Sequence, residues 1–137
     1  MKAIDANVLL YVRDPRDPAK QSIAASLIEA QTDGVLLWQV ACEYLSASRK
    51  LTSVGYTFAD AKEDVEGSRR AWFRALPDWD SLERAYRLMG RFSLSFWDAL
   101  LIGTCLEAGV DCLYCEDFDA YPEIEGLQII NPFRKPA

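Results

Sequence analysis

The alternation of short apolar runs with longer helical segments predicts an α/β fold with a mostly parallel sheet. Strand-like runs occur at residues 1–4, 35–38, 113–115 and 127–130, and helix-like segments separate most of them. Because parallel neighbours need long crossover connections, this order is typical of a sheet covered by helices on both faces. The 137 residues contain no linker, internal repeat or low-complexity stretch, so a single domain over residues 1–137 is expected.

Residues favoured at helix ends mark the expected helix boundaries. Asp17 is a good N-cap with Pro18 at the first helical position, and Thr57 is placed to form a capping box with Asp60. Gly109 is a favourable C-cap for a strongly apolar helix that should be buried. The expected helices cover residues 5–12, 18–31, 39–51, a charged stretch from 58, 80 or 81 to 90, and 96–108, with a short unassigned segment within 71–76.

Composition narrows the class of protein. No apolar run approaches the roughly 18 residues needed to span a bilayer, and Asp5 interrupts the region that a signal peptide would keep apolar. A soluble, cytoplasmic protein is therefore expected.

The net charge of −6 disfavours a protein that coats nucleic acid, although clustered site carboxylates would inflate this negative count. The basic residues are grouped and suit either phosphate contacts or solvated helix faces: Arg13 and Arg16; Arg49 and Lys50; Arg69, Arg70 and Arg74; Arg84, Arg87 and Arg91.

The four cysteines are expected to be free thiols. Cys112 and Cys115 form a C-x-x-C, but residues three apart in a strand point to opposite faces. A structural zinc site needs a second pair at suitable spacing, whereas Cys42 and Cys105 are isolated. Buried or half-buried thiols in a reducing compartment are therefore favoured over a disulfide or a zinc site.

Four acidic residues stand where strands are expected to end and helices to begin. Asp5 follows the first apolar run, and Asp117 follows the run 112–115, so both lie past the carboxyl end of a strand. Glu43 and Asp98 fall in the early turns of two helices. In an open α/β sheet, ligands bind in the crevice at the carboxyl ends of the strands. These four side chains are therefore candidates for one site.

The chain contains no histidine, so any chemistry must use carboxylates, hydroxyls, cysteines or a bound ion. Carboxylates forced together repel one another unless a cation compensates their charge. Oxygen ligands without His or Cys favour Mg²⁺ or Mn²⁺. The reaction that suits such an ion is attack of a metal-activated water on a phosphodiester. The pattern therefore indicates a metal-dependent phosphoesterase.

Each acid also has a structural explanation without function. Asp5 could cap the short helix that follows it, and Glu43 could be an exposed helical residue. Ser95-x-x-Asp98 matches a capping box, and Asp117 could form an Asx-turn. With 21 acidic residues in the chain, spacing alone does not decide between these interpretations.

Three segments carry a resemblance to a known family. They are Ile4-Asp5-Ala6-Asn7-Val8-Leu9-Leu10-Tyr11, Leu94-Ser95-Phe96-Trp97-Asp98-Ala99-Leu100 and Leu113-Tyr114-Cys115-Glu116-Asp117-Phe118. The set resembles PIN-domain proteins, and within them the VapC-type toxin ribonucleases of type II toxin–antitoxin systems. The second segment is the most specific, and the three together extend over the whole chain.

This resemblance implies a fold, an activity and partners. The fold is a three-layer α/β/α sandwich with a short, mostly parallel central sheet. The activity is Mg²⁺- or Mn²⁺-dependent cleavage of RNA. The partners are a second copy of the chain, in a homodimer, and a cognate antitoxin bound in a hydrophobic groove.

The acidic positions of the family match Asp5, Glu43, Asp98 and Asp117. On this hypothesis the three aspartates hold the metal, and the glutamate holds it or orients the attacking water. Asn7 is expected to position Asp5. Two further supporting candidates are Ser95, which would tie Asp98 in place, and Asp119, which would be an auxiliary ligand.

Two positions depart from the family pattern. Ala6 stands where a hydroxyl residue is common, and Cys115 replaces a hydroxyl residue that often precedes the last acidic pair. Both losses would weaken hydrogen bonding to the ligands. A catalytically weak module that binds RNA or protein therefore stays open, as does a carboxylate-metal DNA nuclease. An aspartyl-phosphate phosphatase is disfavoured because Asn7 stands where its second Asp would be. Trp72 and Phe73, which lie among basic residues, are candidates for a partner interface.

Overall fold

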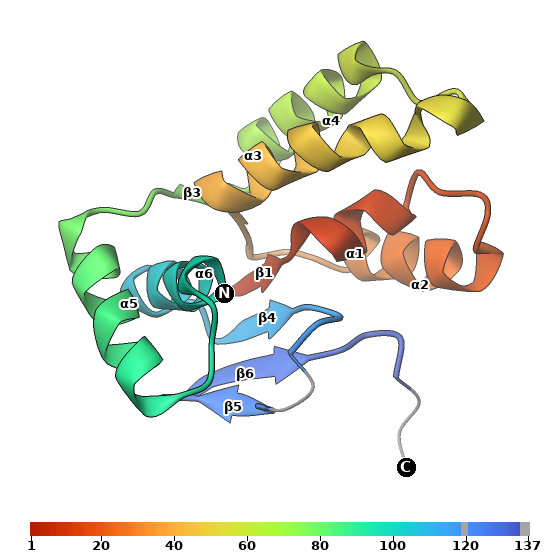
Figure 1. The fold of residues 1–137 in the computed structure, drawn as a ribbon. Helices are drawn as coiled ribbons and strands as arrows, with labels where there is room; N and C mark the ends of the chain where they lie inside the picture. Colours follow the sequence, from red (N-terminus) through yellow and green to blue (C-terminus); the bar gives the residue numbers. More distant parts are fainter. Residues whose placement is uncertain (119–120, 135–137) are drawn as a thin grey trace.

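The computed structural model describes residues 1–118 and 121–134 and confirms the predicted α/β class (Figure 1). Within these residues the strands are β1 (Lys2–Ile4), β2 (Gly34–Leu37), β3 (Phe73–Ala75), β4 (Cys112–Tyr114), β5 (Glu123–Ile124) and β6 (Leu127–Ile130). The helices are α1 (Ala6–Tyr11), α2 (Pro18–Glu29), α3 (Trp38–Ala47), the 3₁₀ helix η1 (Ser48–Val54), α4 (Phe58–Ala71), α5 (Trp79–Arg91) and α6 (Phe96–Glu107).

The strands form one mostly parallel sheet in the order β3-β2-β1-β4-β6-β5. Each neighbouring pair is parallel except β5 with β6. From β1 the chain moves outward to β2 and β3, then returns to β4 on the other side of β1. This reversal makes the boundary between β1 and β4 the topological switch point, where open α/β sheets bind ligands. Residues that follow β1 and β4 are therefore placed at the crevice.

Helices form the two outer layers (Figure 1). α5 and α6, which connect β3 to β4, pack against each other on one side of the sheet. α1 packs on α2 and α3, and α3 packs on α4, on the other side. The short helix α1 lies between the sheet edge and α3, so the first residues after β1 face the elements that follow β2.

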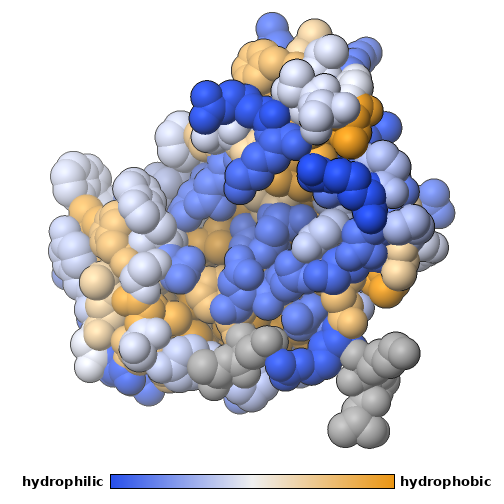
Figure 2. Space-filling model, turned by 45° about the vertical axis from the view of Figure 1, so that its right-hand side comes forward, coloured by the Kyte–Doolittle hydropathy of each residue, from blue (hydrophilic) through white to orange (hydrophobic). Residues whose placement is uncertain are grey.

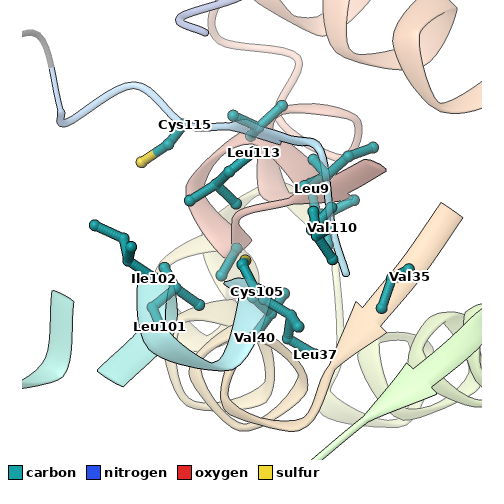
Figure 3. Packing of buried hydrophobic residues seen from close by; sticks show 14 of the residues in the cluster. Leu9, Val35, Leu37, Val40, Leu101, Ile102, Cys105, Val110, Leu113 and Cys115 are labelled. Atoms are coloured by element: carbon teal, nitrogen blue, oxygen red, sulfur yellow. The ribbon is translucent and has the colours of Figure 1, made fainter. Parts of the chain in front are cut away.

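The core lies between the central strands and the apolar helix α6. Leu113 of β4 and Ile102 of α6 are fully buried, and Val8 of α1 is buried from the other side of the sheet. Figure 3 shows Leu113, Ile102 and Cys105 among the buried side chains. α6 is apolar on nearly all sides, which explains why this helix sits deepest. The predicted burial of this helix is confirmed.

Several predicted helix ends are confirmed by their capping contacts. The side chain of Asp17 accepts a hydrogen bond from the backbone N–H of Lys20 at the start of α2. Thr57 and Asp60 form a reciprocal capping box at the start of α4. Gly109 follows α6 with a φ of +74°, a left-handed conformation that favours glycine.

Other helix boundaries differ from the prediction. Trp38 begins α3 rather than ending β2, and the last turns of the predicted helix over 39–51 tighten into η1. α5 begins at Trp79, because Asp78 is its N-cap and forms a capping box with Ser81. Gly90 does not close this helix, which continues to Arg91. Capping by a residue just before the predicted start explains the shift at α5.

Two strands were not predicted because each is short. β3 lies within the unassigned segment 71–76 and pairs with β2 at the edge of the sheet. β5 has two residues and turns back onto β6 through Glu125 and Gly126, which both have positive φ. A two-residue turn of this kind matches the twist of an antiparallel hairpin. A two-residue strand carries too little periodicity for the sequence to show it.

All four cysteines are free thiols, as predicted, and three are buried; Cys42 is exposed, which differs from the predicted buried or half-buried position. None of the helices formed by the described residues has both the length and the apolar composition needed to cross a bilayer.

Candidate metal centre

Asp5 occupies the switch point and is buried, with an exposed fraction of 8%. Its backbone N–H donates to the carbonyl of Tyr114 in β4 at 2.9 Å, which fixes it beside the neighbouring strand. Its Oδ1 accepts a hydrogen bond from the N–H of Ala6 at 2.8 Å, so the residue caps α1. The capping role and the predicted position in the site therefore coincide in one side chain.

The carboxylate of Asp5 is in an unfavourable electrostatic environment. Burial raises the pKa of Asp5 above its ordinary value, and the charges of Glu43 and Asp117 raise it further. Hydrogen bonds from Cys115 and from Ala6 lower the pKa but do not cancel the effect of burial. Glu43 and Asp117 are thus each close enough to repel Asp5, and a cation would relieve this repulsion.

Asp117 lies just beyond β4 and is exposed. Its Oδ2 accepts a hydrogen bond from Nδ2 of Asn7 at 2.8 Å. Asn7 was expected to position Asp5, and this expectation is wrong in the structure. The oxygens of Asp5 already accept from Ala6 and Cys115, while the Asn7 side chain on α1 reaches the loop after β4. Asn7 therefore positions Asp117.

Cys115 donates a hydrogen bond to Asp5, although its replacement of a hydroxyl residue was expected to weaken hydrogen bonding to the ligands. Its thiol donates to Oδ2 of Asp5 at 3.0 Å, and its sulfur accepts the N–H of Asp117 at 3.4 Å. The side chain is 1% exposed. Burial raises the pKa of the Cys115 thiol, and the charge of Asp5 raises it further, so the thiol keeps its proton and remains a donor.

The thiol of Cys115 is therefore expected to orient Asp5. Cys115→Ala removes the donor and should lower Mn²⁺ affinity and RNA cleavage by about 10–100-fold. Cys115→Ser keeps a donor and should remain within a few-fold of the wild type. Calorimetric titration with Mn²⁺ and cleavage rates measure both effects. Wild-type affinity and rate in the alanine variant would show that the thiol has no such role.

Glu43 is held by Gln39, which was not among the predicted site residues. Nε2 of Gln39 donates to Oε1 of Glu43 at 3.0 Å and to the carbonyl of Trp97 at 3.1 Å. Gln39 is buried in the first turn of α3, and Trp97 precedes Asp98 in α6. This amide therefore joins the two helices that carry Glu43 and Asp98. The signal was present in the sequence, because residues four apart share a helix face.

Asp98 lies in the first turn of α6 and is half-buried. Its backbone N–H donates to Oγ of Ser95 at 3.2 Å, so Ser95 caps the helix. Within the described residues, the Asp98 carboxylate accepts no hydrogen bond from the backbone N–H of Ser95, unlike the N3 side chains in the capping boxes of α4 and α5. The carboxylate is therefore left available at a helix end that favours negative charge.

A polar cluster next to Asp117 was also missed from the sequence. Glu116 accepts a hydrogen bond from the hydroxyl of Tyr11 at 3.0 Å and forms an ion pair with Lys20 of α2. The Lys20 ammonium lies over the Tyr11 and Phe133 rings, which pack edge to face. These contacts fix the backbone immediately before Asp117. Only the adjacency of two acids at 116 and 117 pointed to this segment.

Arg13 and Arg16, one of the basic groups that suited either phosphate contacts or a solvated helix face, already form ion pairs. Arg13 makes a bidentate ion pair with Asp64 of α4, at 2.8 and 2.9 Å. Arg16 pairs with Asp14. Asp119, the predicted auxiliary ligand, lies outside the described residues.

The donors at the crevice fit a hard divalent ion that keeps part of its water shell. Within residues 1–118 and 121–134, no three carboxylates or thiols are close enough to form a complete metal cage. Mg²⁺ does not require one, because it is commonly bound through one or two carboxylates, waters and substrate phosphates. Oδ1 of Asn7 is buried without a hydrogen-bond partner in the described structure, so an acceptor beside Asp117 is left unpaired. Asp5 and Asp117 are the candidate ligands, with Glu43 close enough to raise the pKa of Asp5. Gln39 links Glu43 to the backbone of Trp97, the residue before Asp98.

Figure 2 turns the carboxyl edge of the sheet toward the viewer and shows a hydrophilic hollow with the most strongly hydrophilic residues around it. The sequence model of the PIN domain matches residues 2–125. The chain belongs to the PIN-domain family. Its acidic crevice therefore lies in a PIN domain that spans nearly all of the chain.

Solved structures share this PIN fold at low sequence identity. A toxin–antitoxin complex from Klebsiella pneumoniae aligns with a TM-score of 0.72 and 15% identity, over 98% of this chain and 100% of that chain. VapC20 of Mycobacterium tuberculosis, a toxin that cleaves the sarcin–ricin loop, aligns with a TM-score of 0.67 and 18% identity, over 87% of this chain and 92% of that chain. VapBC2 of Rickettsia felis, bound to a promoter DNA fragment, aligns with a TM-score of 0.65 and 9% identity, over 94% of this chain and 96% of that chain. No protein of curated function matched the sequence.

Proposed function

We propose that this PIN domain is a Mg²⁺- or Mn²⁺-dependent endoribonuclease and the toxin of a toxin–antitoxin pair. The observation that carries the proposal is the meeting of Asp5 and Asp117 at the switch point, with Asp5 buried and its negative charge uncompensated. The family and the structural similarity to toxins support it. A divalent ion at this position would supply an activated water and neutralise charge on the scissile phosphate.

The side chains of the centre divide between binding and positioning. Asp5, Asp98 and Asp117 are the proposed metal ligands, and Glu43 holds the ion or accepts a proton from the attacking water. Gln39 fixes the orientation of Glu43 through its hydrogen bond to Oε1. Asn7 fixes the orientation of Asp117, and Cys115 fixes that of Asp5, each through a hydrogen bond to the carboxylate.

Partner binding belongs to the same proposal. Large apolar side chains are exposed on α3, on β3 and its flanks, and on α5 and α6: Trp38, Phe73, Leu76, Trp79, Tyr86 and Trp97. Exposed aromatic side chains are typical of protein interfaces, and they suit a homodimer and a cognate antitoxin. Phe73 supports the interface suggested by the sequence, whereas Trp72 is half-buried and closes over Gly34. We place this activity in the cytoplasm.

The Asp98→Asn variant tests the activity. It should lose metal-dependent cleavage of a structured RNA pool by about a hundredfold or more, because a ligand that contributes several kcal/mol is removed. Asp80→Asn is the matched control, since Asp80 also lies in the first turn of a helix, and that turn packs against the C-terminal half of α6 at Gly103, away from the first turn that carries Asp98. Cleavage by the control but not by Asp98→Asn, and none in EDTA, is the expected pattern.

The same assay separates the competing interpretations. The open spacing of the carboxylates favours, as the second candidate, a module that binds RNA without cleaving it. Such a module would bind RNA equally well in EDTA and would gain no stability from Mn²⁺. Cleavage of DNA in place of RNA would instead identify a carboxylate-metal DNA nuclease.

A further inference from the structure

A pocket opens beside the candidate metal centre, between α1 and the end of α3. Its volume is about 180 Å³. The walls are mainly apolar and come from Leu10, Tyr11, Ala47 and Leu51. The ion pair of Asp14 with Arg16 also lines the pocket, and Lys50 supplies a further cationic group. The pocket is not part of the metal centre, and none of the predicted site residues except Asn7 lines it.

Two hydrogen bonds connect the pocket to the centre. Asn7 lines the pocket and donates to Oδ2 of Asp117. Tyr11 lines it as well and donates to Glu116, the residue before Asp117. A group bound in the pocket would therefore lie one side chain away from the carboxylates.

Arg16 is held by Asp14, so among the described residues that line the pocket Lys50 is the cation left to bind an anion. Lys50 and its neighbour Arg49 are exposed, and no carboxylate in the described residues pairs with either of them. Although the net charge of the chain is −6, these two cations place local positive charge beside the pocket. They complement a phosphate that approaches the centre from the α3 side.

The volume and the apolar lining of the pocket suit a small, largely apolar group. Leu10 and Ala47 provide apolar walls, and the Tyr11 ring is fixed by its edge-to-face contact with Phe133 and by Lys20. Sequence-selective proteins bind RNA mostly at unpaired bases, which they insert between aromatic and apolar side chains. A nucleobase is flat and largely apolar on its faces. The phosphate of the same nucleotide carries a negative charge that complements the positive charge of Lys50.

From this juxtaposition we propose that the pocket receives an unpaired base of the RNA substrate, next to the scissile phosphate, and that Lys50 binds the adjoining phosphate. The proposal rests on the proposed ribonuclease function and specifies its substrate. RNA with an unpaired nucleotide at the cleavage position fits the pocket, whereas a continuous duplex does not, because its bases stay stacked inside the helix.

RNA binding in the absence of metal tests the pocket separately from catalysis. The probe is a fluorescently labelled pool of single-stranded 20-nucleotide RNA of random sequence, measured by anisotropy in EDTA. Ala47→Phe fills the pocket and Lys50→Glu reverses its charge, and each should weaken binding by about tenfold. Arg87→Glu, on the exposed face of α5, is the charge-matched control and should bind like the wild type.

Two further readouts keep the outcomes distinct. Stabilisation by Mn²⁺ should be the same in Ala47→Phe, Lys50→Glu and the wild type, because the pocket does not hold the ion. Unchanged RNA binding in both variants, with normal stabilisation, would overturn the pocket proposal and leave the ribonuclease intact. A wild-type protein that neither binds nor cleaves the RNA pool would overturn the proposed function itself.

Discussion

The Asp5→Asn variant should lose RNA cleavage by about a hundredfold or more and yet be more stable than the wild type when no metal is bound. The activity falls because a metal ligand at the switch point is removed, and such an ion contributes several kcal/mol to catalysis. The stability rises because Asp5 is buried near Glu43 and Asp117, where its charge is unfavourable. We expect a gain of about 1 kcal/mol at neutral pH.

The gain should depend on pH in a defined direction. The pKa of Asp5 is raised in the folded state, so ionised Asp5 destabilises the fold at any pH above that raised value. As the pH falls toward the ordinary value of 3.8, Asp5 takes up its proton and the cost disappears. The stability difference between Asp5→Asn and the wild type should therefore be full at neutral pH and shrink in acid.

Urea unfolding in EDTA at pH 7 and pH 4 measures this difference. Addition of Mn²⁺ should reverse the order, because the ion binds the folded wild type and stabilises it by mass action, but binds the variant weakly. A variant less stable than the wild type at neutral pH without metal would contradict the electrostatic account of Asp5.

Leu113→Ala should be among the most destabilising single substitutions in the chain. Leu113 is fully buried in β4, where it pairs in register with Ala3 of β1 and Ile129 of β6. Removal of its side chain from this central strand leaves a cavity between the sheet and the helices, and we expect a loss of about 2–5 kcal/mol. Because β4 leads directly to Cys115 and Asp117, the variant should also bind Mn²⁺ more weakly.

A surface leucine provides the control for this substitution. Leu76 is 69% exposed, so Leu76→Ala should change stability by no more than about 0.5 kcal/mol. Urea midpoints of the two variants, at equal slopes of the unfolding transition, give the comparison. A loss below about 1 kcal/mol in Leu113→Ala would mean that β4 does not lie at the centre of the core.

The sequence predicted the elements that carry strong periodic or capping signals. The strand and helix around Asp5, the start of α2 at Pro18 and the buried helix α6 are all observed. β3 and β5 were missed, because three and two residues give no periodicity and their pairing depends on neighbours distant in the chain. The boundary of α5 moved because Asp78, and not a later residue, caps it.

The candidate site was predicted by residue type but not by partner. The positions of Asp5 and Asp117 at the strand ends followed from the order of apolar runs and acids. The partner of Asn7, the bridging role of Gln39 and the donor role of Cys115 depend on side-chain directions between elements that are far apart in sequence. Hydrogen bonds of this kind become visible only when the tertiary packing is known.

Calorimetric titration of Mn²⁺ into the wild type and Asp5→Asn tests the central claim, which is a divalent-metal centre at the carboxyl ends of β1 and β4. We predict saturable binding to the wild type and affinity at least about tenfold weaker in Asp5→Asn. Equal Mn²⁺ affinity in the two proteins, or no saturable binding to the wild type, would contradict the assignment of this crevice as the metal centre.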